Sequence, residues 1–374
     1  MSVLADRETP LIRNCWYVLA LASEADRTLR SRKVAGQAVV FYRRLDGNVA
    51  VLRDRCPHRS FPLSKGILDG DRLICNYHGL TFAPDGRCIA KPTDPTNAAP
   101  LSAGTYPVVE RDAVIWIWPG DPALADEALI PAVPWLAQDG WDLVSGYLRF
   151  PANYVALHEN LMDLSHFAFL HAGNIGTPAY AAAPFRVKVE DGRINLRRVL
   201  ENAPLPSLLS VPTELGDKPV TRETDTWWMS PGLNLTHSNV HDPDPAPGRP
   251  GTYAFKVIHF ITPETQNSTH NFWAVARDFR LGDPAIPEHT QASFKVAFQE
   301  DLEALDWIET LQGEEGLEFG EIHLGSDRGG LLMRREMKRR AWREAAPAGS
   351  GPAVRSDVVG QARRLDDHPS EEAA

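Results

Sequence analysis

The sequence of 374 residues lacks several features that mark common functional classes. Its formal net charge is −10, so it has no excess of positive charge to neutralise the phosphates of a nucleic acid. No apolar run reaches the roughly 18 residues that span a bilayer, and the first residues show no basic region followed by an apolar core and a cleavage site. We therefore expect no nucleic-acid partner, no membrane span and no secretion signal, a combination typical of a cytoplasmic protein.

Cysteine is scarce, with four in the chain, and the glycine pattern of a dinucleotide-binding fold is missing. A disulfide between Cys15 and Cys88 is conceivable, but two free thiols are the expected state in a reducing cytoplasm. Because the chain has no flavin or nicotinamide motif, any electrons that it uses must come from another protein.

The other two cysteines lie between residues 55 and 79, in RCPHRSFPLSKGILDGDRLICNYHG. Cys56 and His58 form one pair, Cys75 and His78 form the next, and sixteen residues separate the pairs. A Rieske [2Fe–2S] centre holds one iron by two Cys and the other by two His, so each of two loops must supply one ligand of each kind. The alternative is a zinc site, but zinc sites usually group like ligands on one turn. The pattern predicts a [2Fe–2S] cluster on these four residues.

The length suits about two domains, and the composition, with 43% apolar and 24% charged residues, is ordinary for a globular protein. Short strands joined by turns fill residues 11–118, for example at 33–42 and 49–53. The break PGDP at 119–122 starts a second domain. The predicted fold class is α+β: an all-β Rieske domain over 1–118, then an α+β catalytic domain over 119–344 with a central antiparallel sheet flanked by helices. A disordered tail is expected over 345–374.

In the second domain, the apolar spacing predicts a helix over 154–167 and two later helices over 288–312 and 330–343. Two segments rich in Pro, Asp and Gly, 204–220 and 239–251, are predicted to be loops long enough to cover a pocket. The predicted strands of the sheet are 141–150, 185–190, 194–200, 224–229, 253–262 and 270–278.

A protein that only carries electrons on a Rieske cluster would need about the first 115 residues. The rest of the chain must therefore have another role. Non-haem Fe(II) oxygenases bind iron by two His and one carboxylate, with positions left open for O2. Asp163 and His166 are three residues apart and share a helix face. His166 and His171 can reach one metal only if the helix loosens near its end, which the Ala-Gly-Asn at 172–174 favours.

The third iron ligand should be a carboxylate from elsewhere in the chain. The acid-rich helix predicted over 288–312 offers several candidates, and spacing alone does not choose among them. These candidates are Glu300, Asp301, Glu303, Asp306 and Glu309.

The Cys/His pairs, the run NLMDLSHFAFLH over 160–171 and the acids at 300–301 together resemble the oxygenase component of Rieske non-haem iron oxygenases. The likeness extends from about Arg13 to Arg340 and is to the branch of single-subunit-type aromatic O-demethylases and monooxygenases related to vanillate and dicamba demethylases. The resemblance implies a [2Fe–2S] cluster and a mononuclear Fe(II) held by His166, His171 and Asp301.

The same resemblance implies roles for four further residues. Asp163 would bridge a Rieske histidine of one subunit and His166 of the next, in a head-to-tail homotrimer. Asn160 falls where the family often has a polar group near the iron. Asn234 and His259 match positions that contact the acidic aromatic substrate. His158 is expected to pack in the core rather than bind iron, and no single arginine is identified as the anchor of a substrate carboxylate.

The resemblance implies a terminal oxygenase that uses O2 and electrons from a separate NAD(P)H-dependent reductase or ferredoxin to oxidise a small aromatic acid. The expected reaction is O-demethylation with release of formaldehyde. An aromatic ring hydroxylase or dioxygenase, giving a phenol or a cis-dihydrodiol, is the alternative within this class, since pocket shape decides which carbon faces the oxygen. A Rieske electron carrier or redox sensor, and a zinc-stabilised binding protein, are the alternatives outside it.

Overall fold

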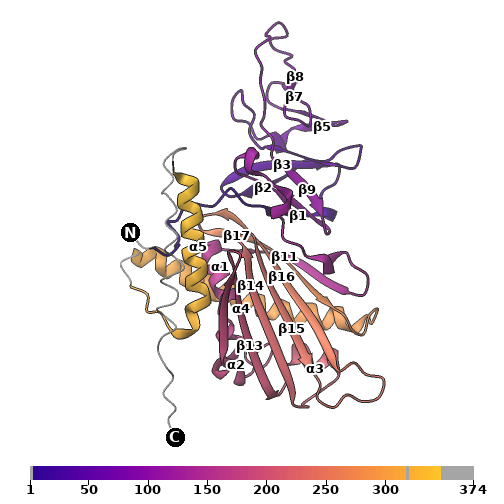
Figure 1. Cartoon of the computed structure of the whole chain (residues 1–374). Helices are drawn as coiled ribbons and strands as arrows, with labels where there is room; N and C mark the ends of the chain where they lie inside the picture. Colours follow the sequence, from indigo (N-terminus) through magenta and orange to yellow (C-terminus); the bar gives the residue numbers. More distant parts are fainter. Residues whose placement is uncertain (1–2, 317–319, 347–374) are drawn as a thin grey trace.

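The structure, a computed structural model, describes residues 3–316 and 320–346. Its N-terminal part consists of three small antiparallel sheets, with strand orders β1-β10-β9, β2-β3-β4 and β5-β6-β7-β8. The last of these forms the end of the molecule that lies furthest from the large sheet (Figure 1). The strands are β1 (Tyr17–Leu21), β2 (Arg30–Val34), β3 (Gln37–Arg43), β4 (Val49–Arg53), β5 (Ile67–Asp69), β6 (Arg72–Ile74), β7 (Thr81–Phe82), β8 (Cys88–Ala90), β9 (Val108–Arg111) and β10 (Val114–Ile117).

The C-terminal part is built on one seven-stranded antiparallel sheet with the order β11-β17-β16-β15-β14-β13-β12. The fold class predicted from the sequence is confirmed: an all-β domain is followed by an α+β domain with a central antiparallel sheet. The strands are β11 (Asp142–Phe150), β12 (Phe185–Glu190), β13 (Arg193–Ala203), β14 (Val220–Ser230), β15 (Leu233–His241), β16 (Thr252–Thr265) and β17 (Ser268–Arg277).

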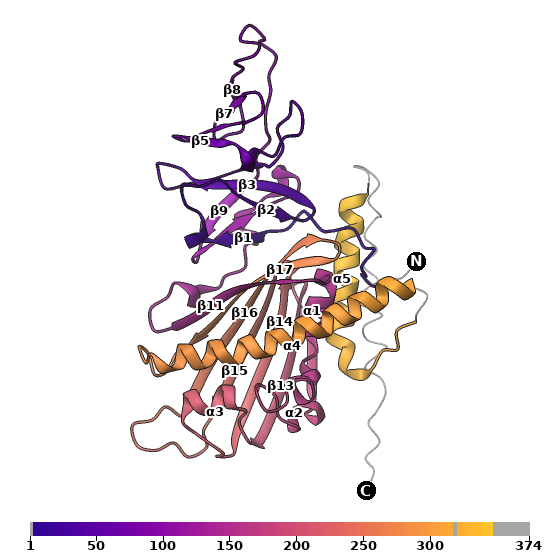
Figure 2. The ribbon, with the colours of Figure 1, turned by 180° about the vertical axis from the view of Figure 1, so that it is seen from behind.

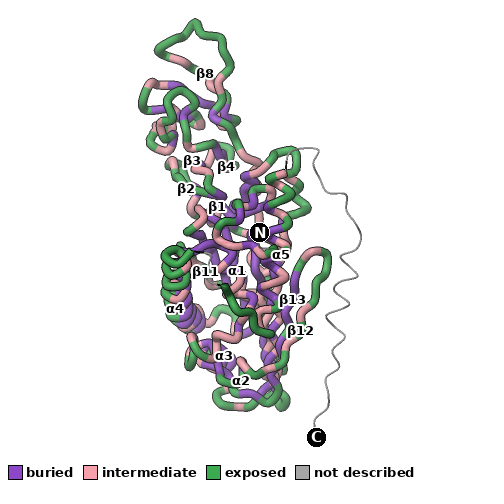
Figure 3. The backbone as a smooth tube through the Cα atoms, turned by 90° about the vertical axis from the view of Figure 1, so that its left-hand side faces the viewer, coloured by how far each residue is buried: buried purple, intermediate pink, exposed green. Residues whose placement is uncertain are grey.

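Helices cover one face and one end of this sheet. The long α4 crosses the sheet on the face seen in Figure 2, with α2 and α3 beside it, whereas α1 and α5 pack at the end near β13 and β14. In α4, Phe294, Ala297, Phe298, Asp301 and Leu305 recur every three or four residues and are buried, while the outer side of the helix is exposed (Figure 3). The helices are α1 (Tyr154–Met162), α2 (Ala179–Ala182), α3 (Ser207–Thr213), α4 (Ala285–Glu315) and α5 (Arg328–Ala345).

The two parts pack against each other along β1, β10 and β16. Trp116 of β10 stands edge-on to Phe260 of β16, with ring centroids 5.4 Å apart, and both side chains are buried. The Thr262 hydroxyl donates to the Val18 carbonyl at 2.8 Å across the same contact. Burial of aromatic rings of this size contributes about 1.5–3 kcal/mol each, so the contact holds the all-β part firmly on the sheet.

Several predicted elements are wrong in detail. The strand predicted over 33–42 is a hairpin, because Ala35 and Gly36 both have positive φ (46° and 78°) and turn the chain. The predicted loop over 204–220 contains α3, and the loop over 239–251 starts only after His241, where β15 ends. The predicted strands omit β15 altogether, since its sequence, LNLTHSNVH, is polar on both faces and hides the alternation.

The helix predicted over 154–167 ends at Met162, where Asp163 takes an extended conformation (φ −129°, ψ 97°) and a short 3₁₀ helix, Leu164–Ala168, follows. The Asp163 carboxylate accepts from the Ser165 N–H at 2.9 Å and so caps this second turn. The chain thus changes direction at the residue where the candidate iron ligands begin.

The remaining expectations concern cysteines, membranes and the tail. Cys15 and Cys88 are free thiols, and burial raises the pKa of Cys15 to about 12. Within the described part of the chain, no helix combines the length and apolar character needed to cross a membrane. Of the tail predicted over 345–374, Ala345 ends α5, and residues 347–374 lie outside the described residues.

Candidate active site

Two loops of the N-terminal part share one backbone design and carry the cysteine and histidine pairs. In each, the cysteine N–H donates to the carbonyl five residues later, and the cysteine carbonyl accepts from the N–H four residues later, at 2.8–2.9 Å. The fourth residue after the cysteine has positive φ in both loops, 60° at Ser60 and 72° at Gly79. Each loop is therefore a closed turn that presents side chains to one side.

The two loops bring two thiols and two imidazoles together. Cys56 and Cys75 are buried, and burial together with the neighbouring Cys75 thiol raises the pKa of Cys56. His58 is exposed and His78 is half-buried, with their ring centroids 4.6 Å apart. Two sulfur and two nitrogen donors, with the nitrogens toward solvent, fit the ligand set of a Rieske cluster.

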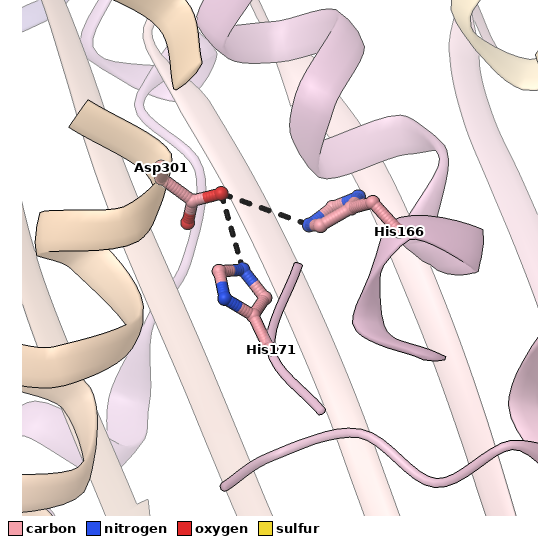
Figure 4. A group of neighbouring side chains, drawn as sticks. All are labelled: His166, His171 and Asp301. Atoms are coloured by element: carbon pink, nitrogen blue, oxygen red, sulfur yellow. Dashed lines mark hydrogen bonds and ion pairs between the residues drawn. The ribbon is translucent and has the colours of Figure 1, made fainter. Parts of the chain in front are cut away.

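A second group of potential metal ligands lies beneath α4. His166 comes from the 3₁₀ helix after α1, His171 from the turn that follows, and Asp301 from the middle of α4 (Figure 4). Asp301 Oδ1 lies 3.1 Å from His171 Nε2 and 3.7 Å from His166 Nε2. One ligand atom from each residue lies within 4.8 Å of the others, so the three could hold one metal ion.

The orientation of His166 leaves one ring nitrogen available to a metal. Its Nδ1–H donates to the backbone carbonyl of Asp163 at 2.7 Å, which places Nε2 toward Asp301. Nε2 is buried and has no hydrogen-bond partner. Since a buried polar atom without a partner is costly, this nitrogen fits a metal ligand, and two His with one carboxylate are the donor set of non-haem Fe(II) sites.

His171 is held in a similar way, but by a side chain. Its Nδ1 lies 2.7 Å from Glu300 Oε2, so Nδ1–H donates to the carboxylate and Nε2 faces Asp301. Burial alone would lower the pKa of His171, but the carboxylates of Asp301 and Glu300 outweigh burial and raise it. Burial dominates for His166, whose pKa is lowered. The sequence named Glu300 only as one of five possible ligands, and the structure gives it this separate position.

Replacing Glu300 with Gln is expected to weaken iron binding by about 10- to 100-fold, because a carboxylate behind a ligating histidine fixes the ring and raises its basicity. The dissociation constant for Fe(II), measured by competition with a chelator, checks this. Glu303→Gln removes an exposed acid from the same helix and should leave the constant unchanged. Equal constants in both variants would show that Glu300 does not position His171.

Asn160 and Asp163 lie next to these ligands in different ways. The Asn160 amide donates to Asp301 Oδ1 at 3.0 Å, and its own Oδ1 is buried without a partner. Asp163 contacts His166 through its backbone carbonyl, while its carboxylate accepts from the backbone and the hydroxyl of Ser165. Asn160 thus holds the candidate ligand Asp301, and the Asp163 carboxylate is half-buried beside the site.

A cavity of about 800 Å³, counting the part open to solvent, lies between α4, the sheet and the turns after α1. A concave, mainly apolar lining with a few polar groups is typical of a site for a small organic molecule. Asn160, Asp301 and His259 line the cavity. Its other walls are mainly apolar, with the side chains of Leu161, Leu164, Phe167, Ile175, Leu208, Leu209, Phe255, Val257, Val275, Phe294, Ala297 and Phe298.

The two residues expected to contact substrate have different positions. His259 is buried and lines the cavity. Asn234 is not among the cavity-lining residues; its Oδ1 lies 3.1 Å from His158 Nδ1, and the Pro231 carbonyl oxygen lies 2.9 Å from His158 Nε2. Burial lowers the pKa of His158 to about 4, so the ring is neutral and packs in the core as expected.

The sequence interpretation missed one cavity residue with a charge, Arg222 of β14. It is 3% exposed and lines the cavity. The signal was present in the alternation along β14, in which Val220, Arg222, Thr224 and Thr226 are buried and the residues between them are half-buried. The predicted strand began only at residue 224, so Arg222 was left outside it.

Comparison with known proteins adds family matches to this geometry. Residues 15–107 match the Rieske [2Fe-2S] domain family, and residues 150–343 match the vanillate O-demethylase oxygenase C-terminal domain family. The oxygenase component of dicamba O-demethylase from Stenotrophomonas maltophilia is 38% identical over 74% of this chain and 81% of its own length. The vanillate O-demethylase oxygenase subunit of a Pseudomonas species is 33% identical over 90% of this chain and 97% of its own length.

A third relative is the iron-sulfur subunit of a toluene-4-sulfonate monooxygenase system from Comamonas testosteroni, 34% identical over 78% of this chain and 86% of its own length. Among solved structures, dicamba monooxygenase bound to 3,6-dichlorosalicylic acid superimposes with a TM-score of 0.83 at 34% identity, covering 90% of this chain and 99% of the other. Another structure of that monooxygenase, with non-haem iron and dicamba, has a TM-score of 0.77 at 32% identity over the same shares.

Proposed function

The chain belongs to the Rieske non-haem iron oxygenases, in the family of the vanillate O-demethylase oxygenase components, and on this premise we propose that it O-demethylates an aromatic acid. The observation that carries the proposal is the group His166, His171 and Asp301, whose carboxylate lines a mainly apolar cavity. The chain is an oxygenase with a [2Fe–2S] cluster and a mononuclear iron.

We assign the metal ligands by donor type and position. Cys56, His58, Cys75 and His78 hold the cluster, and His166, His171 and Asp301 hold the mononuclear iron. On this assignment we propose that residues 1–118 form the cluster domain and residues 119–344 the catalytic domain. A bound iron would supply the activation of O2, with electrons that a bound cluster would provide.

The chain's own residues position the substrate and exclude water. The apolar wall formed by α4 and β16–β17 keeps the aromatic ring dry, and His259 offers a polar contact inside that wall. Asn160 fixes the orientation of Asp301 through a hydrogen bond of 3.0 Å. In the overall reaction, an aryl methyl ether, O2, two electrons and two protons give a phenol, formaldehyde and water, since the hydroxylated methyl group is a hemiacetal that collapses.

The electrons come from a separate NAD(P)H-dependent reductase or ferredoxin, because this chain has no nucleotide-binding motif. The names of its relatives support this, since they are called an oxygenase component, an oxygenase subunit and a subunit of a monooxygenase system.

A homotrimer in which chains meet head to tail would join the two metal sites. The β5–β8 sheet with its ligand loops lies at the end of the molecule away from the catalytic sheet (Figure 1). Aromatic residues are exposed at both ends of such a contact: Tyr77, beside the cluster ligand His78, is 59% exposed, and Phe169, between the iron ligands, is 76% exposed. Aromatic residues are enriched at protein interfaces, and this composition supports contact between the cluster loops of one chain and the iron site of the next.

The test is the ratio of formaldehyde released to O2 consumed, with a compatible reductase, NADH and a panel of methoxylated aromatic acids. Demethylation predicts a ratio near one for at least one acid. Oxygen uptake that yields a ring-hydroxylated product without formaldehyde would instead identify a ring hydroxylase or dioxygenase. An iron content of about two per chain, rather than about three, would identify an electron carrier.

A further inference from the structure

Arg222 is a buried cation that faces the substrate cavity without a counter-ion. Its side chain is 3% exposed, and its Nε and Nη1 atoms are buried without hydrogen-bond partners. Within residues 3–316 and 320–346, no Asp or Glu forms an ion pair with Arg222. Its guanidinium carbon lies over the Tyr180 ring, 5.6 Å from the ring centroid. A buried charge is costly unless it is paired, so the site is complete only when an anion occupies it.

The surroundings of Arg222 fit an anion better than an apolar group. Arg198 of the neighbouring strand β13 also lies over the Tyr180 ring, with its guanidinium carbon 4.9 Å from the ring centroid. Arg198 donates to backbone carbonyls rather than to a carboxylate. Asp163 is close enough to raise the pKa of Tyr180, but within the described part of the chain it forms no ion pair with either arginine. The hydroxyls of Thr224, Thr236 and Ser238 line the same part of the cavity and can donate to anionic oxygens.

We propose that Arg222 and the adjacent hydroxyls form a subsite for the carboxylate or sulfonate group of the substrate. The guanidinium has two buried nitrogens without partners, Nε and Nη1, and each can donate a charge-assisted hydrogen bond to an anionic oxygen. This inference deepens the proposed function, on which it rests, by naming the residue that selects an anionic substrate.

A chain of ring contacts connects Arg222 with the candidate iron ligand His166. The guanidinium carbon of Arg222 lies 5.6 Å from the centroid of the Tyr180 ring. The centroids of Tyr180 and Phe167 are 5.4 Å apart, and those of Phe167 and His166 are 5.0 Å apart. Arg222 and Asp301 also line the same cavity, so one substrate molecule is expected to place its anionic group at Arg222 and its methyl group toward the iron site.

The test is ligand binding, measured by isothermal titration calorimetry on the metal-loaded protein without reductase. The probes are 4-methoxybenzoate and its neutral analogue 4-methoxybenzamide. Wild type should bind the benzoate more tightly, and Arg222→Gln should weaken benzoate binding by about 10- to 100-fold, the value of one or two charged hydrogen bonds. The benzamide constant should change by less than about threefold, and Arg222→Lys should recover part of the benzoate affinity.

Arg197→Gln is the matched control, because Arg197 is exposed on β13 and pairs with Glu223. Its loss removes the same charge from the sheet without touching the cavity and should leave both constants unchanged. Equal weakening of both probes in Arg222→Gln, or equal affinity of wild type for both probes, overturns the proposal; the second comparison needs no variant to fold. The readout is independent of the reaction, so selective benzoate binding without formaldehyde release would retain the subsite and reject demethylation.

Discussion

Replacing Asp301 with Ala is expected to abolish turnover while the [2Fe–2S] cluster remains intact. Asp301 is the one carboxylate of the candidate iron site, it is buried, and its Oδ1 lies 3.1 Å from His171 Nε2. Its loss leaves two neutral histidines, which bind iron poorly. Because metal catalysis contributes several kcal/mol, the rate should fall by at least about a thousandfold. Iron content should fall from about three to about two per chain, with an unchanged visible spectrum of the cluster.

Two further variants separate ligation from packing. Asp301→Asn keeps the shape of the side chain and the contact with Asn160, but it removes the charge that binds the metal, so it should lose the iron as well. Glu303→Ala shortens an exposed acid of the same helix and should keep about three irons. If Asp301→Ala retained the third iron, the mononuclear site would lie elsewhere in the chain.

The cluster loops could be predicted from the sequence because their geometry is local. Each ligand pair lies inside a turn closed by backbone hydrogen bonds over four and five residues. The few residues around Cys56 and around Cys75 therefore determine the geometry of each loop. His166 and His171 were also paired from one short run, but the helix breaks at Asp163, whose carboxylate caps the next turn, and not at the stop predicted over 172–174.

The choice among the five acids of α4 depends on tertiary structure and could not be made from spacing. The crossing of α4 over the sheet turns Asp301 toward the cavity, places Glu300 behind His171, and leaves Glu303 and Asp306 in solvent. Only the family resemblance named Asp301. Glu309 has yet another position, buried at the end of the sheet, where it lies 3.4 Å from Arg7.

The substrate pocket was the least predictable part, for a physical reason. A cavity between a helix and a sheet is lined by residues from many strands, and each contributes one face of an alternating pattern. β15 was missed because polar residues face the cavity on its inner side, and Arg222 was missed with the start of β14. Polar residues on a buried strand face weaken the apolar alternation from which a strand is predicted. The strands that line a polar pocket are therefore the hardest to predict from the sequence.

Replacing Asp163 with Asn is expected to slow electron transfer from the cluster to the iron by about a hundredfold, with both metal centres retained. In the proposed head-to-tail trimer, the Asp163 carboxylate accepts from a cluster histidine of the neighbouring chain while its backbone carbonyl accepts from His166 Nδ1–H at 2.7 Å. Asn keeps one oxygen to cap Ser165 but loses the charge and the second acceptor. Stopped-flow absorbance of a pre-reduced cluster, mixed with O2 and 4-methoxybenzoate, measures the rate of reoxidation.

Ser165→Ala is the control for this variant, because it removes the hydroxyl that bonds Asp163 Oδ2 at 3.0 Å and leaves the carboxylate in place. It should reoxidise at the wild-type rate. Asp163→Asn with a full complement of iron and a wild-type rate would reject the bridge. Loss of the mononuclear iron in that variant would assign the Asp163 charge a different role, in supporting the iron site itself, because Asn retains the backbone carbonyl that accepts from His166 and one oxygen that can cap the turn. Iron content and reoxidation rate together therefore distinguish an electron-transfer residue from one that only shapes the iron site.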